Sequence, residues 1–184
     1  MSYKAPLTST TDFGLMKVGT GLSAVNGTVN TNTIALFDQA YFYSTATQTN
    51  PVASTTNIVS FTNAAINVGI TLIAGTQIQV SKTANYVFQA TLQVNKTTAG
   101  DDLLDVWITR NGVNYPDTNS QSNVIGPLST LALSFSYTLA LNAGDIIQIA
   151  WQAVDTSIRL LAIPTRIGPS RPSTPSARCT LVQL

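Results

Sequence analysis

Histidine and glutamate are both absent from this chain of 184 residues, its eight acidic residues are all aspartate, and it has a single cysteine. Without histidine, neither a Ser–His nor a Cys–His catalytic pair can form, and no histidine-based metal site can be built. A lone cysteine, Cys179, excludes an internal disulfide. We therefore expect a protein that is not an enzyme, with no catalytic, cofactor-binding or metal site and no cofactor.

Charge is also scarce, since only 9% of residues are charged and the formal net charge is +1. A nucleic-acid-binding chain normally presents a basic face, so we expect no nucleic-acid partner. Few charges also indicate a surface that is covered by copies of the chain or by neighbours, because charge keeps single molecules apart. The sequence has no signal-peptide pattern and no apolar run of membrane-spanning length, so we expect no membrane association.

The chain shows instead the alternation of apolar and polar residues that is typical of strands, most clearly over residues 131–151. Large apolar residues occupy every second position there: Leu131, Leu133, Phe135, Tyr137, Leu139 and Leu141. Side chains in a strand alternate between two faces, so this pattern predicts a half-buried strand. The turn-type cluster at 142–145 and the alternation that resumes at Ile147 predict a long antiparallel hairpin. We expect this hairpin to be the core ribbon, with the six side chains buried on one face.

Shorter alternating segments recur along the chain with turn signals between them, and no segment has helical periodicity. The expected strands cover residues 40–43, 58–61, 76–80, 86–94, 104–108, 158–163 and 177–184. Asn111-Gly112 predicts a second tight hairpin, and polar loops are expected at 117–123 and at the proline-rich crossing 164–176. Evenly spaced short strands predict an all-β sandwich or barrel. The final strand is expected to return and pair with an early one, as in jelly rolls.

Residues 1–38 differ in character from the rest of the chain. Asn26-Gly27 lies between β-forming residues, which is the strongest short hairpin signal because both central residues of a type I′ turn need positive φ. The segment has too little apolar surface to fold alone. We therefore expect an extended N-terminal arm over 1–38 that could contain a small hairpin, followed by a head over 39–184.

Three phrases in the head carry a family resemblance: ANYVFQATLQVN, VWITRNGVNYPDTNS and LNAGDIIQIAWQAVDTSIRLLAIP. They resemble the tumour necrosis factor and complement-type globular head superfamily in a Gly-x-Tyr strand, an Asn-Gly hairpin and a Gly-Asp turn before an Ile-rich strand. Ala84-Asn85-Tyr86 departs from the pattern by one missing glycine. The opening FGLMKVGTGLSAVNGTVN and the ending PSRPSTPSARCTLVQL are similar to tailed-phage virion proteins. The resemblance implies an all-β, ten-strand jelly-roll sandwich that forms homotrimers and works by binding.

Three acidic positions form the only carboxylate cluster: Asp101, Asp102 and Asp105. Their oxygens could hold a cation, but the spacing of a calcium loop is absent, and a solvated loop between strands is favoured. Asp145 lies in a turn, where aspartate most often bonds its own backbone. Cys179 has strand spacing with its apolar neighbours, which favours a buried, inert thiol over a nucleophile.

Four arginines crowd the C-terminal quarter: Arg159, Arg166, Arg171 and Arg178. They could form a basic patch for an acidic partner, although pairing with aspartates of a neighbouring subunit is favoured. The aromatic run Tyr41-Phe42-Tyr43 could line a carbohydrate site, but core and subunit interface are the more usual places for aromatics on alternating strands. Asn26 and Asn95 each begin a glycosylation sequon, which we discount without a secretion signal.

These observations favour a virion surface protein, made in the host cytoplasm, that decorates and cements a phage capsid through its arm. Its expected partners are two further copies of itself and the major capsid protein. The alternative is the receptor-binding tip of a tail fibre, with a host surface receptor as partner. A fibre needs a shaft of repeats or a coiled coil, and nothing here repeats. A third hypothesis, a hydrolase or lectin-like domain unrelated to virions, lacks a catalytic set.

Overall fold

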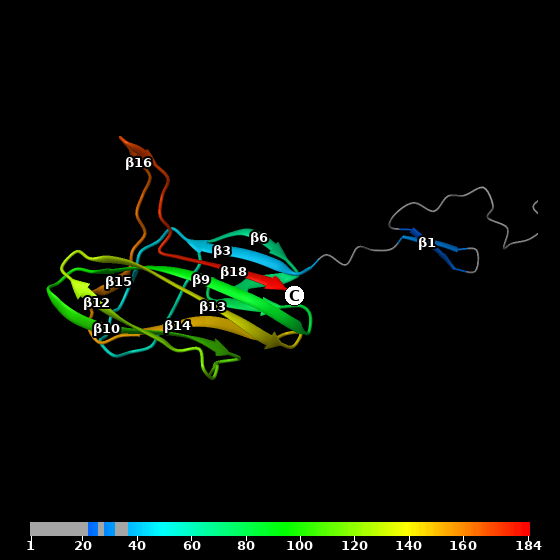
Figure 1. The fold of residues 1–184 in the computed structure, drawn as a ribbon, viewed down its shortest axis with the longest axis horizontal. Coiled ribbons are helices and arrows are strands. Elements are labelled where there is room, and N and C mark those ends of the chain that lie inside the picture. The colour runs from blue at the N-terminus through cyan, green and yellow to red at the C-terminus, as the bar shows by residue number, and fades with distance from the viewer. Residues whose placement is uncertain (1–21, 26–27, 32–36) are drawn as a thin grey trace, which may run out of the picture. The chain divides into compact units, whose positions relative to one another are not determined.

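The computed structural model describes residues 22–25, 28–31 and 37–184 (Figure 1). The chain divides into two units, residues 1–36 and 37–184, and each is described by itself. In the first unit, β1 (Leu22–Val25) pairs antiparallel with β2 (Thr28–Thr31), with Val25 opposite Thr28. This confirms the predicted hairpin. The Asn26-Gly27 turn and the rest of the expected arm up to residue 36 lie outside the described residues.

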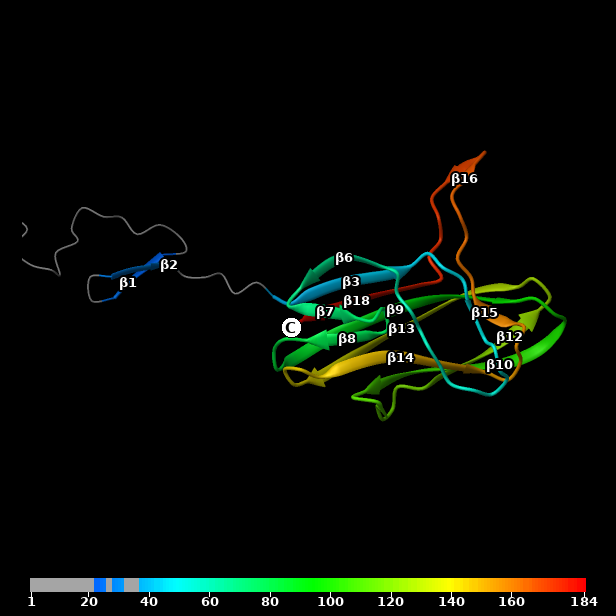
Figure 2. The same cartoon turned by 180° about the vertical axis from the view of Figure 1, so that it is seen from behind.

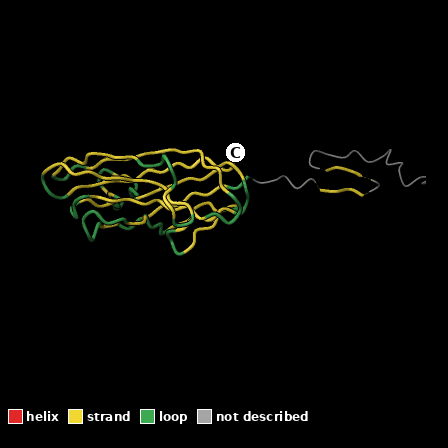
Figure 3. The backbone as a smooth tube through the Cα atoms, turned by 90° about the horizontal axis from the view of Figure 1, so that it is seen from below, coloured by secondary structure: helices red, strands yellow, loops and turns green. Residues whose placement is uncertain are grey.

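The second unit is a sandwich of two antiparallel sheets, which Figure 3 shows edge-on as layers of strand joined by loops. Sheet one has five principal strands in the order β13-β9-β18-β3-β6, with short β15 beside β9 and short β4 beside β15. Their bounds are β3 (Gln39–Ser44), β4 (Gln48–Thr49), β6 (Asn63–Val68), β9 (Ala84–Lys96), β13 (Thr130–Leu141), β15 (Ile158–Leu160) and β18 (Ala177–Gln183).

Sheet two also has five principal strands, in the order β12-β10-β14-β8-β7, with short β11 beside β10 and short β5 beside β14 (Figure 2). Their bounds are β5 (Asn57–Ile58), β7 (Ile70–Ile73), β8 (Gln77–Val80), β10 (Gly100–Arg110), β11 (Val113–Asn114), β12 (Ser120–Gly126) and β14 (Ile146–Ala153). The ten principal strands confirm the predicted all-β jelly-roll sandwich. The described residues contain no helix, and so none that could cross a membrane.

The core lies between the sheets and is centred on β9 rather than on the predicted core ribbon. β9 has neighbours along both edges, β13 on one side and β18 and β15 on the other. Its inward side chains are almost fully buried: Tyr86, Phe88, Ala90, Leu92 and Val94. On β13 the predicted face is correct, but only Leu139 and Leu141 are buried, and Leu131 is 38% exposed. The expectation of six buried side chains was wrong because β13 is an edge strand, which the opposite sheet covers only in part.

The predicted hairpin over residues 131–151 is also wrong. β13 pairs with β9 in sheet one, whereas β14 pairs with β10, β8 and β5 in sheet two. The turn between them carries the chain across the sandwich from one sheet to the other. It is closed by Asp145, whose Oδ2 accepts a hydrogen bond from the Asn142 N–H at 2.7 Å. Such a crossing keeps large residues on the inner face of both strands, so it produces the same alternation as a hairpin.

Turns and short connections agree with the sequence in part. The last strand, β18, pairs with the early strand β3, as predicted for a jelly roll. Asn111 and Gly112 have φ of 52° and 80°, which fits the predicted I′-type turn between β10 and β11. Two predicted loops contain strands. The loop at 117–123 runs into β12, and the 164–176 crossing carries a short hairpin, β16 (Arg166–Ile167) with β17 (Ser170–Arg171).

Two ion pairs, each with one buried partner, hold the ends of the sandwich together. Lys96 of β9 is fully buried and reaches Asp102 of β10 at 2.8 Å, so it joins the two sheets directly. Asp38 precedes β3 and is 1% exposed; its carboxylate accepts hydrogen bonds from Lys82 at 2.6 Å and from Ser81 at 2.9 Å. Gly69, with φ of 67°, lies against that carboxylate, where an added Cβ would collide with it.

Candidate interaction surfaces

The outward surface of sheet one is nearly free of charge, and we call it the smooth face. It is formed by the outward side chains of β3, β18, β9 and β13, chiefly Tyr41, Tyr43, Val87, Gln89, Thr91, Gln93, Ala132, Ser134, Ser136, Thr138, Arg178, Thr180 and Val182. Among the outward residues of these four strands, Arg178 is the only charged one. The scarcity of charge on the smooth face and its tyrosines are features of the centre of protein interfaces.

The centre of the smooth face is built from aromatic and hydroxyl side chains. The rings of Tyr41 and Tyr43 stack with centroids 5.7 Å apart. Phe42 lies between them in sequence but points into the core and is fully buried. Strand alternation therefore separates the predicted aromatic trio, so the three rings cannot line one carbohydrate site. A shallow cavity of about 270 Å³ opens beside Tyr41 and Arg178.

The outer edge of β13 borders the smooth face and has no strand partner in the described part of the chain. β13 is 12 residues long and contains no charged residue and no proline. Beside this edge the side chains of Leu133, Phe135 and Tyr137 are only partly buried. A long edge strand that lacks charge, proline and bulges is usually covered by another element, because its free N–H and C=O groups otherwise pair with other chains.

A short hairpin, β16–β17, stands away from the sandwich in both Figure 1 and Figure 2. Near its tip Ile167 is 95% exposed, and Arg166 pairs with Arg171 across the two strands. An apolar side chain flanked by two arginines on a projecting segment is suited to contact with another molecule.

The four arginines of the C-terminal quarter do not gather into one patch. Arg159 donates from Nε to Asn95 Oδ1 at 2.9 Å, Arg166 and Arg171 lie on the projecting hairpin, and Arg178 lies on the smooth face. Within the described residues, none of the four forms an ion pair with an aspartate. Whether they pair with a neighbouring subunit stays a prediction.

The outward surface of sheet two carries a groove of about 770 Å³. Its floor includes the half-buried indole of Trp107 on β10, whose N–H donates to Asn114 Oδ1 at 2.8 Å. Asp105 stands on the same face two residues earlier. Its Oδ1 accepts hydrogen bonds from Asn119 Nδ2 at 3.0 Å and from Gln121 Nε2 at 3.2 Å. We call this the Trp107 groove.

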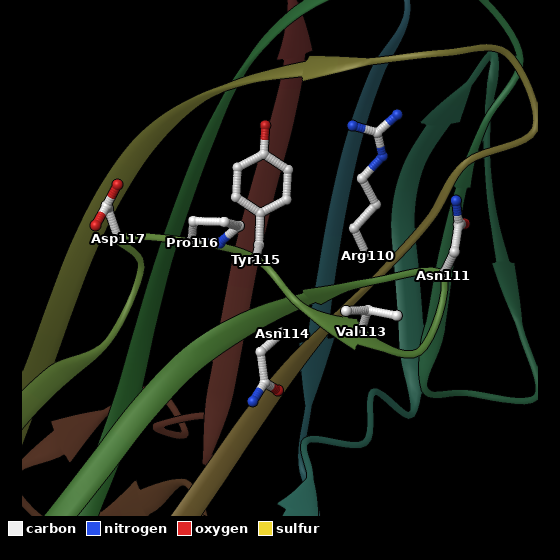
Figure 4. Close-up of a pocket in the computed structure, with 7 residues that line it drawn as sticks. All are labelled: Arg110, Asn111, Val113, Asn114, Tyr115, Pro116 and Asp117. Atoms are coloured by element: carbon white, nitrogen blue, oxygen red, sulfur yellow. The ribbon is translucent and has the colours of Figure 1, made fainter.

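A second cavity, of about 640 Å³, lies beside the segment after the β10–β11 turn (Figure 4). Figure 4 shows Tyr115 and Arg110 projecting to the same side of the ribbon, with Asn114 directed to the other side. Arg110 is engaged at 2.7 Å with Asp145. This cavity therefore has a cation that is already paired and a wall formed largely by apolar and aromatic side chains.

The predicted acidic cluster is divided by strand alternation. The three aspartates lie within β10 rather than in a loop, with Asp101 and Asp105 on one face and Asp102 on the other. Asp102 pairs with Lys96, whereas Asp105 belongs to the Trp107 groove. Among residues 37–184 and the described residues of the first unit, no three His, Cys, Asp or Glu side chains are grouped so as to hold a metal ion.

Asp145 bonds its own turn, as predicted, and it also receives two side chains from β10 and its turn. Burial alone would raise its pKa. The hydrogen bonds from Asn111 and Asn142 and the ion pair with Arg110 outweigh burial, so the pKa of Asp145 lies below its usual value.

Two further expectations concern single side chains. Cys179 is 2% exposed, which confirms its predicted inward position, and burial raises the pKa of its thiol. Asn95, the first residue of a sequon, is also buried, and its amide donates to the Ser129 carbonyl at 2.9 Å. The amide of Asn95 is thus not accessible to a glycosylating enzyme. Asn26 lies outside the described residues.

The Trp107 groove was not predicted from the sequence, although part of its signal was present. Val106 and Ile108 are inward residues of β10, so alternation places Trp107 on the outer face of the sheet. A large aromatic residue on an outward face is a candidate for binding. Asn114 and Asn119 could not have been assigned to the groove in the same way, because they reach it through the path of the loops.

No family model and no curated protein matches this sequence. Solved structures do match its fold. Murine APRIL at pH 8.0 has 13% identity and a TM-score of 0.53, and at pH 5.0 it has 12% identity and a TM-score of 0.52. Both alignments cover 81% of this chain and 100% of the APRIL chain. Eiger TNF from S. frugiperda has 15% identity and a TM-score of 0.47, over 80% of this chain and 92% of that one. The APRIL likenesses show that the chain has a TNF-like jelly-roll fold.

Proposed function

We propose that this protein is a non-enzymatic virion surface protein: a homotrimeric TNF-like jelly roll that decorates and cements a phage capsid. In this proposal the head makes the trimer and the arm over residues 1–38 anchors it to the major capsid protein. The observation that carries the proposal is the smooth face with the unpaired β13 edge beside it. Together they form a long, charge-poor surface that is suited to contact with copies of the same chain.

The energetics of the smooth face favour association. Burying a face of amides, hydroxyls and tyrosines carries little of the desolvation cost that ion pairs would impose. The β13 edge adds a row of backbone groups and a stripe of partly buried Leu133, Phe135 and Tyr137. Closed rings of identical subunits bury such surfaces on every copy. The resemblance to the tumour necrosis factor superfamily implies three subunits.

A binding role rather than chemistry is supported by how the carboxylates are used. Three of the described aspartates are committed to ion pairs that hold the fold: Asp38 with Lys82, Asp102 with Lys96, and Asp145 with Arg110. Cys179 is enclosed in the core. A catalytic nucleophile or general acid has to be accessible to a substrate, whereas Asp38, Asp145 and Cys179 are buried and Asp102 is held by Lys96.

The capsid assignment rests on the sequence similarity of the opening and ending phrases to phage virion proteins, and on two features suited to anchoring. The arm combines β-forming residues with few charges, which suits a segment that orders against a partner by backbone pairing. The projecting β16–β17 hairpin offers Ile167 and two arginines as a second contact.

The deciding experiment is to locate the protein on purified particles. Val113 is 70% exposed at the β10–β11 turn, so Val113→Cys provides one accessible thiol for a gold label, while Cys179 stays enclosed. Electron microscopy of particles carrying the labelled variant should show gold over the capsid shell. Unlabelled wild-type protein treated with the same reagent is the matched control. Gold confined to the tail tip would replace this proposal with the receptor-binding alternative.

A second experiment tests the arm. Protein without residues 1–30 should still form the head trimer but fail to add to undecorated capsids. Full-length protein should bind them with little dependence on salt, because the arm has few charges. If the truncated protein decorates capsids as well as the full chain does, the head makes the contact. If neither form binds capsids and both adsorb to host cells, the protein is a tail-fibre tip.

A further inference from the structure

The Trp107 groove lies on the outward surface of sheet two, whereas the smooth face is the outward surface of sheet one. The two surfaces are on opposite sides of the sandwich. Association through the smooth face would therefore leave the groove open to solvent. Its volume of about 770 Å³ lies within the range of ligand sites, roughly 300–1,000 Å³.

The floor of the groove is an aromatic surface held in a fixed position. The indole of Trp107 is fastened through its N–H to Asn114, so its face, rather than its polar edge, is available. The residue paired with Trp107 on the neighbouring strand is Ala150, whose small, fully buried methyl group leaves room for the indole to lie against the sheet. An indole face of this kind packs well against flat apolar surfaces such as the C–H face of a sugar ring.

The walls of the groove offer hydrogen-bond donors and acceptors side by side. Asp105 uses Oδ1 for Asn119 and Gln121, which leaves Oδ2 as an oriented acceptor with no protein partner in the described chain. Asn119 Oδ1 and Asn114 Nδ2 likewise have no protein partner among the described residues. On the opposite side Gln152 donates to the Ser54 carbonyl at 2.8 Å, and this bond fixes its orientation. The polar groups are thus prearranged before any ligand arrives.

The combination excludes several ligand classes. Two carboxylates, Asp105 and Asp117, line the groove without a paired cation in the described structure, so they would repel an anion. A purely apolar ligand would remove water from the polar walls without forming hydrogen bonds to them. A cation could use the carboxylates, Asn119 Oδ1 and the indole, but it would leave the free N–H donors of Asn114 Nδ2 without an acceptor. A hydroxyl both donates and accepts, so a polyhydroxylated ligand satisfies the amides and the carboxylates together.

We propose that the Trp107 groove binds a neutral saccharide, with one pyranose ring stacked on the indole of Trp107 and its hydroxyls bonded to Asp105, Asn114 and Asn119. The inference does not depend on the capsid role. A decorating trimer with this groove would display one saccharide site on each subunit, facing outward. The same site on a fibre tip would serve for attachment to a cell-surface glycan.

The two tryptophans of the chain make the test specific. Trp107 is half-buried in the groove, whereas Trp151 is fully buried in the core, so the neutral quencher acrylamide should quench the fluorescence of Trp107 far more than that of Trp151. The full-length protein is titrated with a panel of neutral tetrasaccharides made of glucose, galactose, mannose or N-acetylglucosamine. We expect at least one member to protect the protein from acrylamide quenching. Trp107→Ala should remove both the quenchable signal and binding measured by calorimetry.

Asp105→Asn keeps the size of the side chain but removes its charge, and it should weaken binding roughly tenfold. Ile167→Ala, on the projecting hairpin, is the matched control and should bind as the wild type does. Circular dichroism of each variant checks that the fold is retained. The proposal is overturned if no saccharide in the panel protects Trp107, or if Asp105→Asn and wild type bind equally. It is also overturned if tetramethylammonium protects Trp107 and the saccharides do not, which would identify a cation site.

Discussion

Arg110 Nη2 lies 2.7 Å from Asp145 Oδ2, and this ion pair ties the end of β10 to the turn that carries the chain from sheet one to sheet two. The same carboxylate accepts hydrogen bonds from the Asn111 side chain and the Asn142 N–H, both at 2.7 Å. Asp145 is only 7% exposed, so these partners replace most of its contact with water. The crossing between the sheets therefore depends on one ionised side chain.

Asp145 should make the stability of the protein depend on pH in the acid range. Its pKa is lower in the folded protein than in the unfolded chain, so the ionised form stabilises the fold above about pH 4 and this stabilisation is lost as the pH falls. Asp145→Asn removes the titration. The difference in the free energy of unfolding between wild type and this variant, measured by denaturant titration, should be largest near pH 7 and shrink toward pH 3. A difference that stays constant with pH would contradict the assignment.

Removing one partner of the Lys96–Asp102 ion pair should lower the stability of the protein strongly. Replacing both residues by apolar ones should lower it only a little. Lys96 Nζ is enclosed, and without Asp102 it would keep only the carbonyls of Thr98 and Ala99 and the Thr98 hydroxyl. Asp102→Ala should therefore lower the free energy of unfolding by about 3 kcal/mol, because it leaves a buried charge unpaired. The double variant Lys96→Met/Asp102→Leu should recover most of that loss. Chemical denaturation of the three proteins checks this. A double variant no more stable than the single one would show that the charges are needed for the fold.

Two packed phenylalanines allow the centre of sheet one to be compared with its edge. The rings of Phe88 on β9 and Phe135 on β13 have centroids 6.2 Å apart, but Phe88 is fully buried and Phe135 only partly so. Phe88→Ala should cost about 3–5 kcal/mol, because it leaves a closed cavity. Phe135→Ala should cost about 2 kcal/mol, since water can reach the space at the edge. Thermal or denaturant unfolding compares them, with Ser134→Ala as a control near zero. A larger loss for Phe135→Ala would place the structural centre on β13.

The sequence predicts the faces of strands better than their partners. On β13 and β14 alternation assigned the inward side correctly, but it could not distinguish a hairpin from a crossing between sheets. Both arrangements keep Leu141 and Ile147 inside, and the choice depends on contacts of Asp145 with residues about 35 positions away. β12 was missed for a related reason. It has one buried residue, Val124, so its alternation carries almost no apolar signal.

For the candidate surfaces, too, the sequence predicts which face of a strand a residue lies on but not what that residue contacts. The uncharged outer positions of β13 and β9 can be read directly from the alternation, and so can the outward position of Trp107. The groove itself could not be predicted. It requires Asn114 and Asn119 to converge on β10, and that convergence is produced by the β10–β11 turn and the loop after it.

Cys179 should react with thiol reagents only when the protein unfolds. It lies in the core on β18, and burial raises the pKa of its thiol, which lowers the fraction of reactive thiolate at neutral pH. Labelling with a chromogenic disulfide reagent should be at least about a thousandfold slower in native protein than in denaturant. The added thiol of Val113→Cys should label quickly in the native state. Fast labelling of wild-type protein would put Cys179 on the surface and reverse the assignment of faces on β18.

The smooth face should control the state of assembly. Ser136 is exposed on β13 and is separated by one strand from Thr180 on β18, with Gln89 between them in register. Ser136→Arg adds a charge to this surface without entering the core, so the monomer should fold as before. In an assembly the guanidinium would be buried near its own copies, and like charges brought together across an interface cost several kcal/mol. We expect wild type to sediment as a trimer and Ser136→Arg to remain a monomer at micromolar concentration.

Asn123→Arg, an exposed position on β12 of sheet two, is the matched control and should form trimers as wild type does. If Ser136→Arg assembles normally while Asn123→Arg does not, the subunits meet through sheet two, and the Trp107 groove would then lie at the interface.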